Sequence, residues 1–247
     1  MFKKEELSNQ VLVIIPARGG SKGIPKKNLQ KIHGKSLVEW AILSALRISF
    51  ETTIILSSDS PEILKIAEKY EEVIPSERPE ILSADYVADY QVLRHELEIA
   101  ELSESKKYSC IVMLQPTSPL RNPDTVDFCI QQVLKGNHSS AWTVSAVPKK
   151  FHPRKQFYLE DKILKMSIKS PLVIARQELQ ASYIRNGVCY AISRDTLVGD
   201  ETLLGRNSLA VIQNWPTVNI DEPIDLLEAR ELCIEKGDLL VPKGEIL

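Results

Sequence analysis

The residue types best suited to chemistry gather in one glycine-rich stretch near the N-terminus. Arg18-Gly19-Gly20-Ser21-Lys22-Gly23 directly follows the apolar run Val11–Ile15, and Lys27 comes shortly after it. Glycines let a backbone approach a ligand closely and adopt positive φ, and successive N–H groups in such a loop bind anions. Arginine and lysine side chains add cations that offset phosphate charge. The stretch therefore predicts a phosphate site.

A solvated turn has a similar composition, but the position of the stretch favours a ligand site. In open α/β sheets, ligands bind beyond the carboxyl ends of the strands. The spacing matches neither the GxxxxGK[ST] motif of P-loop NTPases nor the GxGxxG motif of dinucleotide-binding proteins. Both of those classes therefore become less favoured.

The elements that must position this loop alternate between strands and helices. Apolar runs predict the strands, and capping signals with proline in the first turn predict helix starts. The expected strands are Val11–Ile15, Thr53–Leu56, Cys110–Leu114, Ala141–Val147, Asn186–Ile192 and Thr217–Ile220. Helices are expected from Ser36, from Ser60-Pro61, around Tyr86–Glu101, from Asn122 and from Pro223, with a loop over Pro75–Ala84. This alternation predicts an α/β fold, a three-layer α/β/α sandwich with a mostly parallel, mixed sheet.

The pattern changes near Pro148. Residues 148–183 are basic, and the run QFYLEDKILKMS within them predicts a short hairpin. We interpret residues 148–183 as an insertion, either a lid or a dimerisation arm, in a single domain that spans residues 1–247.

Bulk composition narrows the class of protein. The chain has 247 residues, of which 43% are hydrophobic, and a formal net charge of -2, which does not suit DNA or RNA binding. The four cysteines are far apart and are expected to be buried thiols. Neither a secretory segment nor an apolar run long enough for a membrane span is visible. We expect a cytoplasmic protein that binds neither nucleic acid nor membrane.

Blocks along the whole chain resemble the acylneuraminate cytidylyltransferases, the CMP-sialic acid synthetase family, in a bacterial nonulosonate-type member. They occur in family order: PARGGSKGIPKKN at Pro16–Asn28, LQPTSPLR at Leu114–Arg121, Arg176-Gln177, Asn186-Gly187 and Asn219-Ile220-Asp221. The resemblance implies a nucleotide-diphospho-sugar transferase-like fold. It also implies the transfer of CMP from CTP to the anomeric hydroxyl of a 2-keto sugar acid, with release of pyrophosphate. The implied cofactor is Mg²⁺, for which Mn²⁺ can substitute. The implied assembly is a homodimer in which Lys155 completes the neighbour's site.

The resemblance also implies the roles of individual residues. The nucleotide-binding set is Arg18, Gly20, Ser21, Lys22, Lys27, Asn28 and Arg78; the set that binds the sugar acid is Gln115, Thr117, Lys155, Arg176, Arg185 and Asn186. The metal set is Asp221 and Asn219, and the catalytic set is Arg18, Lys22, Gln115 and Asp221. By sequence statistics alone, Asp221 is the N-cap of the helix opened by Pro223. Asp59 likewise belongs to the cap region of the next helix along the chain, which begins at Ser60-Pro61. We find no side-chain base, so the hydroxyl proton is expected to leave to a metal-bound hydroxide.

The chain departs from the sialic acid pattern mostly on the sugar side. Asn219 stands where a second aspartate precedes the metal aspartate, and Ile184-Arg185-Asn186-Gly187 replaces Arg-Pro-Asn-Gly. Ser83-Ala84-Asp85 replaces an Ala-Ser-Asp run. Pseudaminate-like and legionaminate-like acids therefore stand beside N-acetylneuraminate as acceptors.

Two other functions stay open at this point. One is a nucleotidyltransferase for another acceptor, such as the eight-carbon acid KDO or a sugar phosphate. The other is a non-catalytic, nucleotide-binding regulator, since Asn219 is a weaker metal ligand than aspartate.

Overall fold

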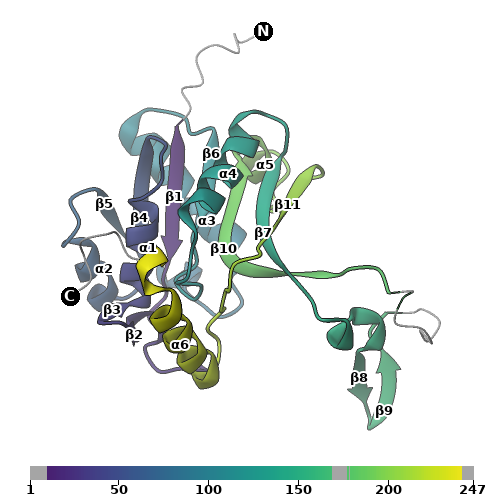
Figure 1. Ribbon diagram of the computed structural model, residues 1–247. Coiled ribbons are helices and arrows are strands. Elements are labelled where there is room, and N and C mark those ends of the chain that lie inside the picture. Colours follow the sequence, from purple (N-terminus) through teal and green to yellow (C-terminus); the bar gives the residue numbers. More distant parts are fainter. Residues whose placement is uncertain (1–9, 169–176, 178, 241–247) are drawn as a thin grey trace.

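The centre of the molecule is a seven-stranded mixed sheet. A computed structural model describes residues 10–168, 177 and 179–240, with residues 234–240 described by their backbone alone. The strand order is β11-β7-β10-β6-β1-β4-β5 (Figure 1). The bounds are β1 Val11–Pro16, β4 Thr52–Ser58, β5 Val73–Glu77, β6 Cys110–Met113, β7 Ser140–Ala146, β10 Tyr183–Ser193 and β11 Ser208–Ile212. Neighbouring strands are parallel except at β10, which runs antiparallel to β6 and β7. The predicted mostly parallel, mixed sheet is confirmed.

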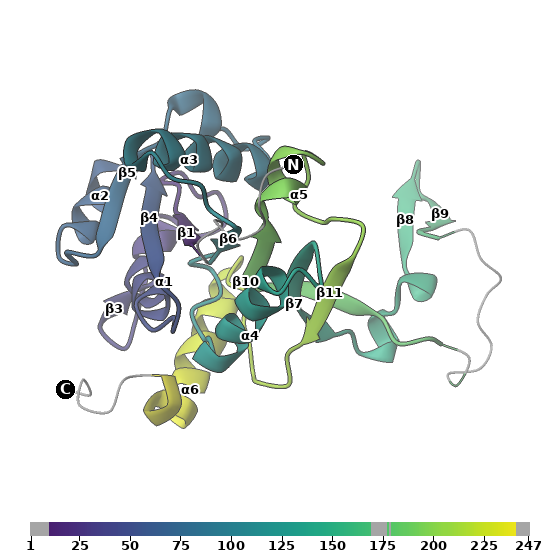
Figure 2. The same ribbon diagram turned by 90° about the horizontal axis from the view of Figure 1, so that it is seen from above.

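Helices cover both faces of this sheet, as Figure 2 shows. Val11, Val13 and Ile15 of β1 face one cluster of buried residues, whereas Leu12 and Ile14 face the other. The first cluster includes α1 (Leu37–Ala45), α2 (Pro61–Ala67) and α4 (Pro123–Leu134), and the second includes α3 (Asp89–Glu104) and α5 (Arg194–Val198). Alternation along a strand buried on both sides produces this division. The predicted three-layer sandwich is confirmed.

A third apolar cluster fixes the C-terminal part against the N-terminal loop. Helix α6 (Pro223–Leu240) contributes Leu226, Ala229 and Cys233, which pack in one cluster with Ile24 and Trp40. Ile24 directly follows the glycine-rich stretch, so this packing holds the stretch beside the segment before α6. Short elements complete the described fold: β2 Lys31–Ile32, β3 Lys35–Ser36 and the 3-10 helices Lys27–Leu29, Glu80–Leu82, Lys149–Phe151 and Pro153–Lys155.

Local signals placed most helix starts correctly. Ser36 and Glu39 form the predicted capping box at α1, and the Asn122 side chain accepts a hydrogen bond from the backbone N–H of Asp124. Ser60 occupies the N-cap position of α2, but its side chain makes no capping hydrogen bond. Helix α3 begins at Asp89 rather than at Tyr86.

One loop prediction and one strand prediction were wrong, and one strand was missed. The expected loop Pro75–Ala84 contains the end of β5, because β5 is an edge strand that tolerates Pro75. The expected strand Thr217–Ile220 is not a strand: Val218 and Ile220 are buried in the third cluster, so their alternation reflects packing near α6 instead of sheet pairing. Strand β11, at the opposite edge of the sheet, was not predicted.

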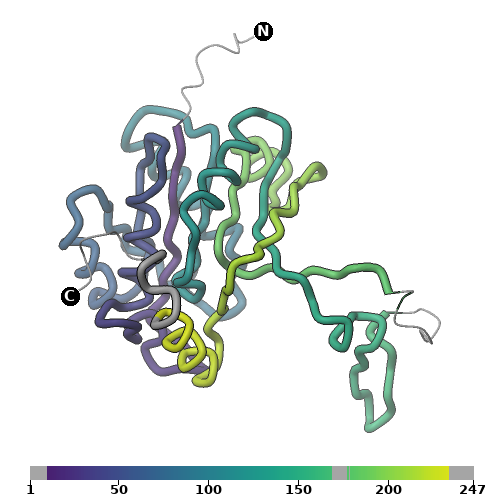
Figure 3. The backbone as a smooth tube through the Cα atoms, in the orientation of Figure 1, coloured from purple at the N-terminus to yellow at the C-terminus, as the bar shows by residue number. Residues whose placement is uncertain are grey.

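Between β7 and β10 the chain leaves the sheet and returns to it, as the tube in Figure 3 shows. The backbone N–H of Val147 donates to the carbonyl of Ser182 (2.9 Å), which joins the outgoing and returning segments. Farther out lies the predicted hairpin, formed by β8 (Phe157–Glu160) and β9 (Ile163–Met166). Its turn residues Asp161 and Lys162 both have positive φ, as a type I′ turn requires.

An ion-pair cluster on the α3–α5 face gives the fold a pH dependence. The buried Glu101 carboxylate accepts hydrogen bonds from Arg194 Nε (2.6 Å) and Nη2 (2.9 Å) and from Lys107 Nζ. Burial alone would raise the pKa of Glu101, but the hydrogen bonds from Arg194 and Lys107 outweigh it and leave the pKa below its ordinary value.

We expect Glu101→Gln to destabilise the protein at neutral pH by about 1–3 kcal/mol, since a charge-assisted contact is lost. A carboxyl whose pKa is lowered by folding stabilises the fold above its unfolded pKa and loses that contribution as the pH falls through its folded pKa. The difference in unfolding free energy between the two proteins, measured with urea, should therefore be full at pH 7 and shrink as the pH falls below about 4. A difference that is the same at pH 7 and pH 3 would contradict this assignment.

Candidate active site

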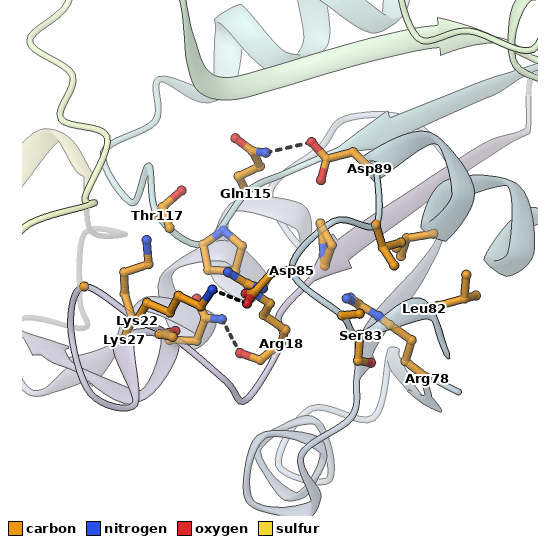
Figure 4. Close-up of a pocket in the computed structure, with 18 of the residues that line it drawn as sticks. Arg18, Lys22, Lys27, Arg78, Leu82, Ser83, Asp85, Asp89, Gln115 and Thr117 are labelled. Carbon is orange, nitrogen blue, oxygen red and sulfur yellow. Dashed lines mark hydrogen bonds and ion pairs between the residues drawn. The ribbon is translucent and has the colours of Figure 1, made fainter. Parts of the chain in front are cut away.

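A cleft of about 420 Å³ opens at the carboxyl ends of β1 and β6, where the sequence places the glycine-rich stretch. Figure 4 shows its lining. Many of the expected site residues line this cleft together, although they come from distant parts of the chain: Arg18, Ser21, Lys22, Lys27, Asn28, Arg78, Gln115, Thr117 and Asp221.

Gly19 and Gly23 allow the loop backbone to approach neighbouring atoms closely, and they do not adopt an unusual backbone conformation. Gly19, Gly20 and Gly23 all lack positive φ, so that part of the prediction was wrong. A Cβ atom at Gly19 would lie 2.8 Å from Cβ of Ser60, and one at Gly23 would lie 2.6 Å from the carbonyl oxygen of Asp221. These glycines let the loop lie against its neighbours. A Cβ at Gly20 would meet nothing within 4 Å, so packing does not require glycine there.

Two side chains fix the loop by forming hydrogen bonds with its backbone. Asp59 Oδ1 accepts from the backbone N–H of Gly19 (2.7 Å), so Asp59 anchors the loop instead of capping α2. Asn28 Nδ2 donates to the carbonyl of Arg18 (2.8 Å), while its Oδ1 is buried with no partner among the described residues. A buried acceptor left without a partner is uncommon. Because Asn28 lines the cleft, this oxygen suits a donor group on a bound ligand.

The cations of the cleft converge on carboxylates. Asp85 lies 2.5 Å from Arg18 Nη1 and 2.6 Å from Lys22 Nζ, and these hydrogen bonds, that from Lys22 first, lower the pKa of Asp85. Lys27 Nζ donates to Asp221 Oδ1 and to the carbonyl of Ile220, both at 2.9 Å. Arg18 and Lys22 thus already share one anionic partner, which is the arrangement that a phosphate group needs.

Arg78 is buried in the wall of the cleft and held rigidly. Its Nε donates to Ser57 Oγ (3.0 Å) and its Nη2 to the carbonyl of Ser57 (2.9 Å). Ser57 Oγ in turn donates to Glu96 Oε1 (2.6 Å). Burial lowers the pKa of Arg78, and the negative charge of Glu96 partly offsets this effect. The guanidinium therefore has a fixed place at the side of the cleft.

Arg121, the last residue of LQPTSPLR, explains why that motif has its shape. It is buried and donates through Nη2 to the carbonyl of Gln115 and through Nε to the carbonyl of Val188 (2.8 Å). Burial lowers its pKa to about 10. The side chain of Gln115 then points across the cleft, where Nε2 donates to Asp89 Oδ2 (3.3 Å; Figure 4). Arg121 therefore positions Gln115. A simple turn of the same composition would not need a buried arginine for this purpose.

Asp221 faces the cleft and does not cap α6. The backbone N–H groups of Asp221 and Glu222 are taken by Asp225 Oδ2, at 2.9 and 2.8 Å, so the N-cap interpretation of Asp221 was wrong. Asp221 Oδ2 accepts from Asn219 Nδ2 (2.7 Å), and Asn219 Oδ1 accepts from Thr117 Oγ1 (3.0 Å). Asn219 thus turns its amide nitrogen, not its oxygen, toward Asp221. In the described part of the chain, no three His, Cys, Asp or Glu side chains gather as a metal site.

The other expected site residues lie apart from the lining. Asn186 is buried, where its Oδ1 accepts from Thr143 Oγ1 (2.7 Å) and its carbonyl accepts from Ser118 Oγ (2.7 Å). Its side chain therefore fixes the strand. Arg185 is exposed on β10, within electrostatic reach of Asp89. Lys155 lies in the segment that leaves the sheet, and Arg176 falls outside the described residues.

The sequence did not identify several residues that shape this cleft as part of the site: Asp59, Asp85, Asp89, Glu96 and Arg121. The position of Arg121 within LQPTSPLR was a usable signal. The others are separated from their partners by long stretches of sequence, so only the fold brings them together. None of the helices in the described residues is long and apolar enough to cross a membrane.

Comparisons with known proteins agree with this geometry. The model of a family described as cytidylyltransferase matches residues 12–209. The chain is 31% identical to a pseudaminic acid cytidylyltransferase of Campylobacter jejuni, over 90% of this chain and 95% of that protein. It is 28% identical to a CMP-N,N'-diacetyllegionaminic acid synthase of Legionella pneumophila, over 94% of this chain and 100% of that protein.

The fold is also found among solved structures. A CMP:2-keto-3-deoxy-manno-octonic acid synthetase, solved in complex with CTP, superposes with a TM-score of 0.65 over 92% of this chain and 99% of that one, at 17% identity. This likeness concerns the fold alone, and it confirms the expected nucleotide-diphospho-sugar transferase-like architecture. The sequence matches decide the rest: this chain is a nucleotidyltransferase and belongs to the cytidylyltransferase family.

Proposed function

We propose that this nucleotidyltransferase transfers CMP from CTP to the anomeric hydroxyl of a nonulosonate, a nine-carbon 2-keto sugar acid, and releases pyrophosphate. The observation that carries the proposal is the convergence of Arg18, Lys22 and Lys27 in one cleft with Gln115 and Asp221. Two relatives that match nearly the whole chain carry the names of pseudaminic and legionaminic acid enzymes, which supports an acceptor of that class. Support for the eight-carbon acid KDO as the acceptor is limited to a likeness of fold to its synthetase.

The cleft suits a reaction that depends on positioning and charge neutralisation. The anomeric oxygen bonds to the α-phosphorus, and the bond from that phosphorus to the bridging oxygen of the β-phosphate breaks. Pyrophosphate leaves with the electron pair, and the hydroxyl proton is released. Arg18 and Lys22, which share Asp85 here, exchange that carboxylate for phosphate oxygens when CTP binds. Asn28 Oδ1, a buried acceptor, is free for a donor of the nucleoside.

The residues around Asp221 fit a magnesium ion that arrives with the triphosphate. Mg²⁺ prefers oxygen ligands and is often held by one or two carboxylates with phosphates and water. Asp221 provides a carboxylate that is 65% exposed at the cleft, beside Lys27. When bound, Mg²⁺ or Mn²⁺ offsets charge on the phosphates. Asn219 would join the ligands only if its amide turned, since its oxygen now accepts from Thr117.

Pyrophosphate release tests the proposed reaction. The protein is incubated with Mg²⁺, each nucleoside triphosphate in turn and a panel of acceptors: N-acetylneuraminate, pseudaminate, N,N'-diacetyllegionaminate, KDO and a sugar phosphate. We expect release with CTP and a nonulosonate. Release only with UTP would assign another donor, and release only with KDO or only with a sugar phosphate would assign another acceptor class. No release with any pair, despite CTP binding, would favour a regulator and sink the proposal.

We further propose a homodimer that the outlying hairpin holds together. One face of the hairpin is apolar, because Leu159 pairs with Leu164 and Phe157 pairs with Met166. Leu159 is 73% exposed and Leu164 is 65% exposed. An uncovered apolar face of this kind marks an interaction surface, and the same face of a second copy is self-complementary to it. Lys155, just before the hairpin, is then available to the neighbouring subunit.

We expect Leu159→Glu together with Leu164→Glu to convert the dimer into a monomer, since facing carboxylates would be buried without partners. Light scattering during size-exclusion chromatography should show a mass near the 27.8 kDa of one chain instead of twice that value. Leu102→Glu is the control, because Leu102 is 81% exposed on α3, away from the hairpin. A wild-type protein that is monomeric at micromolar concentration would contradict the proposal.

A further inference from the structure

Asp89 is a carboxylate in the cleft to which the expected reaction assigns no role. It is the first residue of α3, and its side chain lines the cleft. Asp89 Oδ2 accepts from Gln115 Nε2 at 3.3 Å, and the described residues give it no ion pair within 4.0 Å. Figure 4 shows the two side chains facing each other at one side of the cleft.

A carboxylate at this place works against substrate binding. CTP and a sugar acid are both anions, so a negative charge in the wall of their cleft repels them. A neutral side chain such as asparagine would accept a hydrogen bond from Gln115 equally well. The charge of Asp89 therefore calls for a function of its own.

The surroundings of Asp89 suit a group that takes up a proton. Burial raises its pKa above the ordinary aspartate value, while the positive charges of Arg185 and then Arg78 oppose that rise. The hydroxyl of Tyr190 also lies within electrostatic reach, and it accepts from the backbone N–H of Gly187 (2.8 Å). A carboxylate with a raised pKa is a better base, because a general base works best when its pKa lies near the operating pH.

Asp89 also lies at the boundary between the two expected substrates. Its hydrogen-bond partner Gln115 belongs to the sugar side, whereas Arg78 belongs to the nucleotide side. The acceptor hydroxyl and the α-phosphate meet at that boundary. The other carboxylates of the site lie elsewhere: Asp85 lies beside Arg18 and Lys22, on the side expected to hold the triphosphate, and Asp221, beside Lys27, is the expected metal ligand. Glu96 is wholly buried behind Ser57, and none of the cleft-lining residues that the structure describes is a histidine.

We propose that Asp89 is the general base that removes the proton from the acceptor hydroxyl, with Gln115 holding the carboxylate in place. This inference rests on the proposed function. The hydroxyl proton moves to the free oxygen of Asp89 while the hydroxyl oxygen bonds to the α-phosphorus and pyrophosphate leaves with the electrons of the broken bond. Protonated Asp89 then returns its proton to water. The step replaces the metal-bound hydroxide expected from the sequence.

The test compares Asp89→Asn and Asp89→Ala with the wild type. Initial rates are measured between pH 5 and 9 with saturating Mg²⁺ and CTP and the acid that the wild type uses best, and CTP binding is measured by calorimetry. Asparagine keeps the acceptor for Gln115 but loses the base. We expect both variants to lose about 10²–10⁴-fold in kcat, to bind CTP within about threefold of the wild type, and to lose the acidic limb of the pH–rate profile. Asp124→Asn is the control, since Asp124 is an exposed carboxylate in the first turn of α4.

Each alternative role of Asp89 gives a different result. If Asp89→Asn keeps its rate and the acidic limb while Asp89→Ala does not, Asp89 only positions Gln115. If CTP binding weakens by more than about tenfold while kcat is unchanged, Asp89 is part of the nucleotide site. Either result overturns the inference. A wild-type protein without pyrophosphate release would instead count against the proposed function, so the two failures are distinguishable.

Discussion

Replacing Arg18 with alanine is expected to lower kcat/KM for CTP by about 10²–10³-fold, which corresponds to about 3–4 kcal/mol of lost charge stabilisation. Two effects act together. The variant loses a guanidinium that reaches the cleft, and it leaves Asp85 with Lys22 as its remaining partner (2.6 Å). The carboxylate then repels the triphosphate more strongly. Steady-state kinetics at fixed Mg²⁺ measure the loss, and thermal unfolding checks that the variant is folded.

Lys26→Ala is the matched control for this variant. Lys26 belongs to the same loop, and its removal changes the net charge equally, but it pairs with Glu62 (2.6 Å) and does not line the cleft. We expect its kcat/KM to stay within about threefold of the wild type, as for an exposed ion pair. The double variant Arg18→Ala with Asp85→Ala should recover part of the loss. Equal losses in Lys26→Ala and Arg18→Ala would show that only the general charge of the loop matters.

Gly187→Ala is expected to destabilise the protein by about 2–5 kcal/mol, through backbone strain and overpacking together. Gly187 has a φ of +74°, and a Cβ there would lie 2.3 Å from Ser118 Oγ and 2.9 Å from Gln115 Oε1. The new methyl group must therefore push the LQPTSPLR segment, which carries Gln115 into the cleft. Activity should fall along with stability.

Gly136→Ala separates strain from overpacking. Gly136 has a similar φ of +71°, but a Cβ there would meet nothing within 4 Å. This control should cost only about 1–2 kcal/mol and leave the kinetics unchanged. Urea unfolding of both variants gives the comparison. A Gly187→Ala protein as stable and active as Gly136→Ala would contradict the close packing at this point.

The sequence was sufficient where local chemistry determines structure. The buried run Val11–Ile15, the capping box at Ser36 and the Asn122-Pro123 helix start each depend on residues a few positions apart, and each is confirmed. Predictions from the sequence failed where residues distant in the chain determine the local structure. Pro75 is compatible with a strand only because β5 lies at the edge of the sheet, and Val218 alternates with Ile220 because of α6.

The site divides in the same way. The glycine-rich loop and LQPTSPLR are continuous motifs, so their residues could be named from the sequence, and most of them line one cleft. Asp85 lies in an irregular stretch and Asp89 at the start of α3, and neither belongs to a motif. Their roles depend on Arg18 and Gln115, which come from the loops after β1 and β6. Asn186 was assigned to the sugar acid because it belongs to a motif, yet its side chain is used by Thr143.

CTP labelled on its α-phosphorus shows directly whether the α-phosphate ends on a sugar acid. The protein is incubated with Mg²⁺, pseudaminate or N,N'-diacetyllegionaminate, and CTP that carries its label on the α-phosphorus. We expect the label to enter a phosphodiester that resists phosphatase, in an amount equal to the pyrophosphate released. Label that stays in CTP, or that is found only in free CMP, with each nonulosonate tested would contradict it.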